Sequence, residues 1–160
     1  MKGNNSLFLV GIIFMFTFLA CTKNTEELID DPLNVQFFND SNSDFTIKVI
    51  EVRSRGLIGE ENQEMGDWGN NLLTGDLILD PGSSTSFVLN IPTYEWSEYR
   101  IGVIDGNGNT EMVLPNPLIG VQGTLPISHL ESNDRKVSIE VKYDESKDAI
   151  YIASWSDFAI

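Results

Sequence analysis

The sequence predicts an all-β domain, and more narrowly an antiparallel β-sandwich of the immunoglobulin-like kind with about eight strands. Two observations lead to this prediction. Short segments in which apolar and polar residues alternate recur along the chain, which is the period-two pattern of half-buried strands. Turn-forming residues cluster between these segments, and no long stretch after residue 20 shows the period of an amphipathic helix.

Residues 1–20 are expected to be a cleaved signal peptide that takes no part in the fold. A basic start at Lys2 is followed by an apolar run over 7–19 and by a small residue, Ala20. This run is shorter than the ~20 apolar residues that span a bilayer as a helix. Cys21 follows directly, and it is the only cysteine in the chain, so no disulfide partner exists for it.

The segment Phe18-Leu19-Ala20-Cys21 resembles the lipobox of bacterial lipoproteins, with Phe18 in place of the usual leucine. The resemblance implies that Cys21 becomes the acylated first residue of the mature protein, carrying chains such as palmitate. Several acyl chains anchor a protein firmly, because each buried methylene contributes about 0.8 kcal/mol. An ordinary signal peptide with a chance cysteine, or an uncleaved anchor, is the alternative.

We therefore expect a lipid-anchored protein of the cell envelope, in the outer membrane, on either its periplasmic or its surface face. Residues 21–32 are expected to be a polar tether, and 33–160 the folded domain. The tether segment 22–27 loosely resembles the surface-export signal of some Gram-negative lipoproteins, and it is equally well explained as a plain linker.

The charge of the chain excludes some partners. Loss of Lys2 with the leader leaves nine basic residues against 24 acidic ones, a formal net charge of −15. Nucleic-acid binding requires lysine and arginine against phosphate, so it is not expected. Solubility at a crowded surface or binding of a cation agrees with this charge. Residues 21–160 are enough for one domain with its own core.

Within the domain, the apolar positions place the strands. The second strand carries a shift of phase, from Phe45, Ile47 and Val49 to Ile50 and Val52, which predicts a β-bulge. The expected strands, including one around the Trp68 segment, are 34–38, 45–54, 67–73, 85–91, 99–104, 111–114, 137–143 and 149–155.

Turns and loops separate these strands. Pro81-Gly82 suits the central positions of a type II turn, and 106–109 suits the tip of a hairpin. A long loop over 55–66 carries an acidic cluster, Glu60, Glu61 and Glu64. Ser128 is expected to cap a single helical turn.

A group of small exported bacterial β-domains resembles this chain over about 34–114. The resemblance implies the β-sandwich fold, and no activity is established for that family that would carry over. It does not extend to 124–160. The motifs that carry it are Trp68-Gly69-Asn70-Asn71-Leu72-Leu73, Pro81-Gly82-Ser83-Ser84 and Tyr99-Arg100-Ile101-Gly102-Val103-Ile104-Asp105, which correspond to Trp-Gly-x-Asn-Leu-Leu, Pro-Gly-x-Ser and Tyr-x-x-x-Val-x-Asp.

Catalysis is not expected, because no nucleophile, base and orienting group are identifiable together. His129 is the only histidine, and no nucleophile motif surrounds any serine. A zinc site would need a histidine–cysteine cluster, which the sequence lacks.

One candidate cation site stands out, formed by Asp105, Asn107 and Asn109, with Glu111 nearby. Oxygen ligands at alternate positions with glycines between them are typical of calcium loops. The same residues also form a good hairpin turn, which is the simpler interpretation. No other cofactor is expected.

Aromatic residues supply the candidate ligand site. Tyr94 and Trp96 are expected to be an exposed pair in the loop 92–98, and Trp68 is expected to plug the end of the core. The sequence therefore predicts a binding or adhesion module for a glycan or a protein partner, acting through loops 55–70 and 92–98. The alternative is a structural envelope accessory that assembles with a neighbouring protein through a sheet edge.

Overall fold

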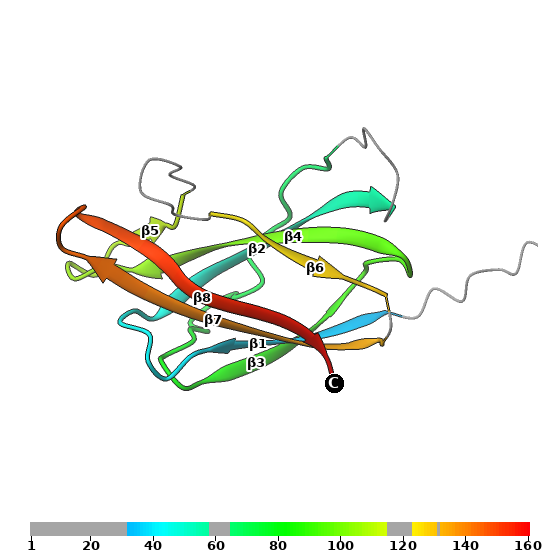
Figure 1. The fold of residues 1–160 in the computed structure, drawn as a ribbon, viewed down its shortest axis with the longest axis horizontal. Coiled ribbons are helices and arrows are strands. Elements are labelled where there is room, and N and C mark those ends of the chain that lie inside the picture. The colour runs from blue at the N-terminus through cyan, green and yellow to red at the C-terminus, as the bar shows by residue number, and fades with distance from the viewer. Residues whose placement is uncertain (1–31, 58–64, 115–122, 131) are drawn as a thin grey trace, which may run out of the picture.

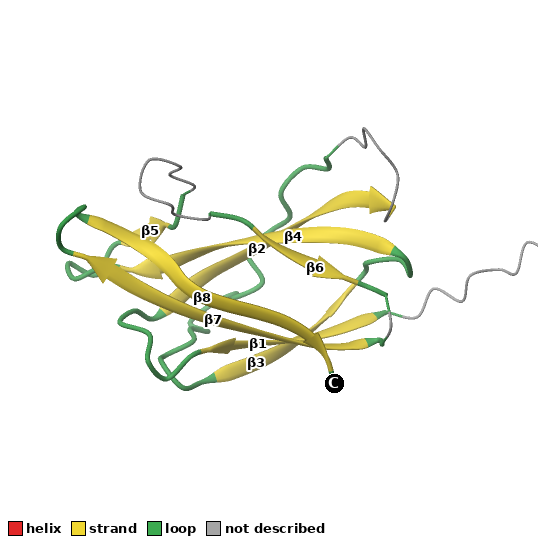
Figure 2. Ribbon diagram, in the orientation of Figure 1, coloured by secondary structure: helices red, strands yellow, loops and turns green. Residues whose placement is uncertain are grey.

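The computed structural model describes residues 32–57, 65–114, 123–130 and 132–160, and every regular element in these ranges is a β-strand (Figure 2). No helix that could cross a membrane is found among these residues. The predicted leader, the lipidation site Cys21, the tether to residue 31 and the acidic cluster of the 55–66 loop lie outside the described residues. The strands are β1 (Leu33–Asn39), β2 (Ile47–Leu57), β3 (Ser84–Leu89), β4 (Glu95–Ile104), β5 (Thr110–Met112), β6 (Leu125–Ser128), β7 (Asp134–Asp144) and β8 (Ala149–Ala159).

These strands form two sheets that pack face to face, so the predicted all-β sandwich is confirmed (Figure 1). The first sheet has the order β3-β1-β7-β8. In the second, β4 pairs with β2 on one side and with β5 and β6 on the other. One pair departs from the antiparallel prediction, because β1 and β7 are parallel. Parallel neighbours need a long crossover, which the whole second sheet supplies here.

The core lies between the inner faces of the two sheets, and the predicted alternation is mostly confirmed. Tyr99, Ile101 and Val103 of β4 are fully buried. Tyr143 continues the apolar alternation of β7, which predicts an inward position, but it is 44% exposed, because β7 runs past the end of the core. The buried apolar residues of β1 and β7 are Leu33, Val35, Phe37, Val137, Ile139 and Val141.

Three register shifts interrupt the pairing of the described strands. The register of β2 against β4 shifts between Ile47 and Val49, as the phase of the apolar residues predicts, and again between Ser54 and Gly56. A third shift, between Glu140 and Val141 of β7, leaves Ala153 of β8 as the extra residue. The strand β8 then continues to Ala159, four residues beyond the predicted end.

The Trp68 segment is not the strand that its sequence predicts. It runs irregularly along the outer edge of β2, where Gly69 N donates to Val52 O at 2.9 Å and Leu72 N donates to Ile50 O at 2.8 Å. The side chain of Asn71 replaces the missing backbone ladder. Its Oδ1 accepts from Ile50 N and Leu73 N, and its Nδ2 donates to Lys48 O and Leu73 O.

Two of the remaining turn predictions are confirmed, and one is wrong. Gly82 has φ 85°, and Ser83 N donates to Asp80 O at 2.9 Å, as expected for a type II turn. The hairpin tip at 106–109 also forms, between β4 and β5. Ser128 caps no helical turn, because it is the last residue of β6 and lies opposite Trp96 in the sheet.

Candidate ligand-binding site

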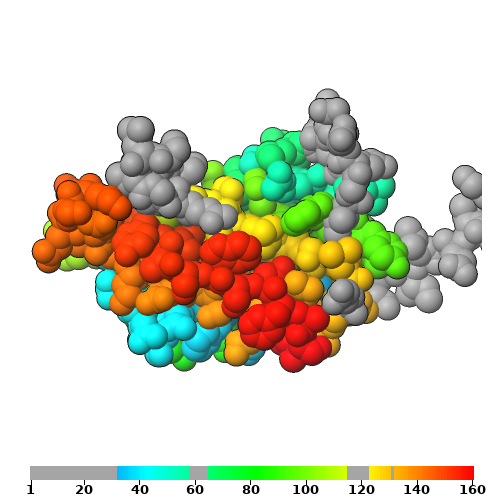
Figure 3. Space-filling model, viewed as in Figure 1, coloured from blue at the N-terminus to red at the C-terminus, as the bar shows by residue number. Residues whose placement is uncertain are grey.

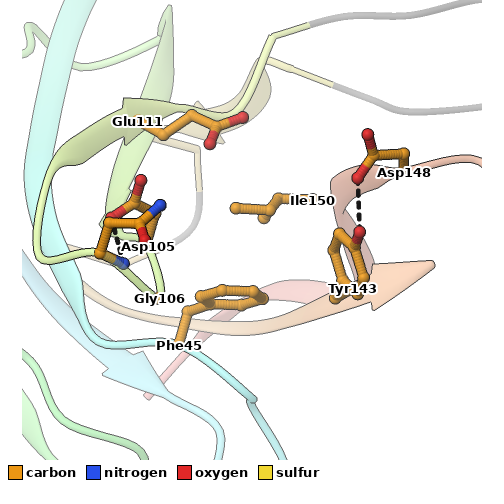
Figure 4. Close-up of a pocket in the computed structure, with 8 residues that line it drawn as sticks. Phe45, Asp105, Gly106, Glu111, Tyr143, Asp148 and Ile150 are labelled. Carbon is orange, nitrogen blue, oxygen red and sulfur yellow. Dashed lines mark hydrogen bonds between the residues drawn. The ribbon is translucent and has the colours of Figure 1, made fainter. Parts of the chain in front are cut away.

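One end of the sandwich carries an open cleft of about 530 Å³ between two hairpin tips (Figure 4). The tip between β4 and β5 forms one wall, and the tip between β7 and β8 forms the other. Small-molecule sites typically measure about 300–1,000 Å³ and combine an apolar surface with a few polar groups. This cleft has that composition: Phe45, Asp105, Gly106, Asn107, Glu111, Tyr143, Asp148 and Ile150.

The apolar part of the cleft comes from three segments. Phe45 lies just before β2 and Ile150 lies near the start of β8, and both are half-buried and pack against the core. Tyr143 lies near the end of β7, and its hydroxyl donates to Asp148 Oδ1 at 2.5 Å. This hydrogen bond raises the pKa of Tyr143 above its ordinary value, with a smaller contribution from burial. The bond fixes the exposed ring beside the cleft.

The opposite wall is organised by the carboxylate of Asp105. Its Oδ1 accepts hydrogen bonds from Asn107 N at 2.9 Å and from Asn109 N at 2.7 Å. Its Oδ2 accepts from Asn109 Nδ2 at 3.3 Å. These bonds, above all the one from Asn109 N, lower the pKa of Asp105 below its usual value. The wall is therefore a hairpin held by one ionised side chain.

The predicted calcium ligands are thus close together, but in the form of a turn. Both oxygens of Asp105 point at donors of Asn107 and Asn109, and a cation would have to replace those bonds. Within the described ranges, no group of three or more histidine, cysteine, aspartate or glutamate residues is placed to hold a metal. Calcium binding by Asp105, Asn107 and Asn109 stays a prediction, and the plain turn accounts for the geometry.

Tyr94 and Trp96 lie at the other end of the sandwich. Trp96 is near the start of β4 and Asp105 follows its end, about 30 Å away along an extended strand. Tyr94 is exposed, with φ 67°, and its N donates to His129 O at 2.8 Å. Trp96 is half-buried, facing Gly56 of β2 in register.

Trp68 is not the core plug that the sequence suggests. Two guanidinium groups contact its ring: that of Arg53 lies 4.3 Å from the ring centroid and that of Arg100 lies 4.4 Å from it. Arg53 also pairs with Glu98, and Arg100 pairs with Glu51. Two cation–π contacts therefore hold the half-buried ring against the second sheet. Trp68 thereby clamps the segment that covers the edge of β2.

His129 is a structural residue of the end that carries Tyr94. Its side chain is buried, Nδ1 donates to Ile91 O at 2.7 Å, and Nε2 lies 2.9 Å from Asn133 Oδ1. Asn133 O in turn accepts from Asn34 N at 2.7 Å, next to the start of β1. Both ring nitrogens are engaged in holding loops together, an arrangement that suits bracing better than proton transfer.

Sequence reasoning identified one wall of the cleft and missed the other. Asp105 and Asn107 were singled out as a turn or cation site, whereas Phe45, Tyr143 and Asp148 were not. The missed residues come from separate segments, and only the pairing of β7 with β8 and the packing of the sheets bring them to one place. The position of Tyr143 at the end of a predicted strand is the one signal that the sequence offers.

Comparisons of the chain with protein-family models, with characterised proteins and with solved structures find no match. The resemblance to small exported bacterial β-domains, which depends on short motifs, therefore stays a prediction. The case for function depends on the geometry of the chain itself.

Proposed function

We propose that this protein is a non-catalytic, lipid-anchored protein of the bacterial outer membrane whose β-sandwich binds a glycan. The observation that carries the proposal is the cleft lined by Phe45, Tyr143 and Asp148. Aromatic rings bind the apolar faces of sugars, and carboxylates accept hydrogen bonds from sugar hydroxyls. A protein partner would instead need roughly 800 Å² of matching surface, whereas a concave site of this size suits a small ligand.

The position of the cleft agrees with presentation away from a membrane. Leu33 starts β1, which pairs in parallel with the first residues of β7, whereas Tyr143 lies at the far end of β7. Eleven residues of extended strand span about 33 Å. In Figure 1 the two hairpin tips lie opposite the end where β1 begins. A lipid on Cys21 would thus leave the cleft at the end remote from the bilayer.

Binding of an oligosaccharide panel tests this proposal. The full-length chain is purified in a nonionic polyoxyethylene detergent, which carries neither sugar nor charge, and titrated calorimetrically. Tyr143→Ala is expected to weaken binding at least tenfold, a loss of about 1.4 kcal/mol. Tyr94→Ala is the matched control, since this tyrosine is also exposed but lies at the other end. Loss of binding in the control alone, or no binding by any glycan, overturns the proposal.

A second candidate function, the structural accessory, is favoured by β8. This strand is an edge of its sheet and is 11 residues long, with Trp155 and Phe158 exposed. Figure 3 shows its residues, in red, on the surface of the molecule. Its one charged residue, Asp157, is turned onto Arg135 at 2.8 Å, so no charge on the strand repels a partner strand.

Photo-crosslinking in intact envelopes separates the two candidate functions. A benzophenone side chain at position 155 is expected to give a discrete adduct if β8 recruits another strand. The same side chain at Val88 of the shorter edge strand β3 is the control. Ser154→Lys is expected to abolish the adduct, because lysine on an edge disfavours strand addition. Equal labelling at both positions would dismiss the structural accessory.

A further inference from the structure

We infer that the glycan bound in this cleft carries a protonated amine, so that the site selects amino sugars over neutral or N-acetylated ones. This inference depends on the proposed function, because it names the chemistry of the ligand at the same site. It starts from the juxtaposition of an apolar surface, formed by Phe45, Tyr143 and Ile150, with carboxylates on both walls (Figure 4).

The lining of the cleft is one-sided in charge. Among the described residues that line it are Asp105, Glu111 and Asp148, and none of these lining residues is a lysine or an arginine. The two lysines nearest in sequence to Tyr143 are occupied by acids: Lys142 lies 3.0 Å from Asp44, and Lys147 lies 3.2 Å from Asp144. A concave surface with carboxylates of one sign concentrates the negative potential and attracts a cation.

The three carboxylates differ in how many of their oxygens already accept hydrogen bonds within the protein. Asp105 accepts hydrogen bonds within its own hairpin, and Asp148 accepts from Tyr143 through one oxygen. The carboxylate of Glu111 makes no hydrogen bond or ion pair with any described residue, and it lies on the β5 wall. An ammonium group that enters the cleft can therefore pair with Glu111 without displacing an internal bond.

The apolar side of the cleft favours an organic cation over a metal ion. Calcium is coordinated by about six to eight oxygen ligands. The side chains of Phe45 and Ile150 provide none of these oxygens, so this part of the cleft does not suit calcium. A sugar ring with an amine presents an apolar face to Phe45 and a charge to Glu111. An ammonium near the face of Tyr143 also gains a cation–π attraction.

Two oligosaccharides that differ only in charge test the inference. The glucosamine tetramer and its fully N-acetylated counterpart are titrated against the full-length chain at pH 6 and low salt. The glucosamine tetramer is expected to bind at least tenfold more tightly, and to lose most of that advantage at high salt, where exposed charges are screened. The acetylated tetramer is expected to show no such dependence on salt.

Variants assign the selectivity to the cleft. Glu111→Gln is expected to reduce the preference for the charged tetramer to less than threefold while leaving the affinity for the acetylated one unchanged. Glu145→Gln makes the same change of charge in the β7–β8 turn, at an exposed residue that does not line the cleft, and is expected to keep the preference. A fall of equal size in both variants would assign the preference to the overall negative field and overturn the inference.

The outcomes also separate this inference from the proposed function. If both tetramers bind equally, or the acetylated one binds more tightly, the inference fails while glycan binding stands. If neither tetramer binds but a neutral glycan of the panel does, the inference again fails alone. If no glycan binds at all, both fail together.

Discussion

Both ends of the sandwich carry polar and aromatic side chains. The two ends differ in how many of these side chains are used in hydrogen bonds within the protein. At the end where β1 begins, His129 joins Ile91 and Asn133, and the backbone of Asn133 holds Asn34. At the far end, two hairpin tips stand apart, and the cleft between them exposes Tyr143 and Glu111. Hydrogen bonds close one end, whereas the other keeps polar and aromatic groups available to a ligand.

The comparison shows that an aromatic residue near a loop is a poor guide to a binding site by itself. The sequence predicts Tyr94 and Trp96 as the exposed aromatic pair, but Trp96 is half-buried within the fold. The sequence does not predict Tyr143 as a ligand contact, because it continues the apolar alternation of β7. Tyr143 is exposed because strand β7 extends beyond the end of the hydrophobic core.

The largest expected effect concerns the closed end. His129→Ala removes a buried side chain and both of its hydrogen bonds, and it is expected to lower the free energy of unfolding by about 2–4 kcal/mol. Urea unfolding followed by circular dichroism measures the change. Leu130→Ala, at the exposed neighbour, is the control and is expected to stay within about 0.5 kcal/mol. A stable His129→Ala protein would show that this end is not braced as described.

The next effect concerns the clamp on the side of the second sheet. Trp68→Ala removes the ring that contacts both Arg53 and Arg100 and is expected to cost about 1–2 kcal/mol of stability. Glycan affinity is expected to be unchanged, because Trp68 does not line the cleft. Asp67→Ala, at the exposed preceding residue, serves as the control. If Trp68→Ala instead weakened glycan binding and left stability unchanged, Trp68 would be a ligand contact.

The smallest effect concerns pH at the open end. The pKa of Asp105 is lowered in the folded protein by hydrogen bonds from Asn109 and Asn107, from an ordinary value of 3.8. The stabilisation that its ionised form gives to the hairpin is therefore complete above that value and is lost as pH falls through the lower, folded-state pKa. Amide exchange at Asn109, corrected for its intrinsic rate, is expected to accelerate in acid.

The same measurement on Asp105→Asn provides the control. That variant is expected to show fast exchange at Asn109 at every pH, with no acid transition, because no carboxylate remains to titrate. An acid transition of the same size in Asp105→Asn would mean that another group holds this hairpin.

Much of the fold was predictable from the chain, because it depends on local periodicity. The alternation in 99–104 predicts which residues of that strand are buried, and the phase shift between Val49 and Ile50 predicts the bulge in β2. The irregular path at Asn71 was not predictable, since its side chain replaces backbone partners that only the folded sheet supplies. The parallel pairing of β1 with β7 was missed for the same reason, because nothing local encodes a neighbour a hundred residues away.

The candidate site was predictable only in its hairpin half. Asp105 and its glycine-rich neighbours form a turn from local chemistry, and the sequence predicts that turn. The partner wall at Tyr143 and Asp148 is brought near by packing between the sheets, to which a single sequence gives no access. Motif reasoning therefore favoured the aromatic loop 92–98, at the opposite end.

The most direct test of the account maps the glucosamine tetramer on the protein by amide chemical-shift perturbation. The account predicts shifts at cleft residues Asn107, Glu111, Tyr143 and Asp148, and none at Tyr94 or Trp96. Shifts confined to Tyr94 and Trp96 would contradict it and restore that aromatic pair as the binding site.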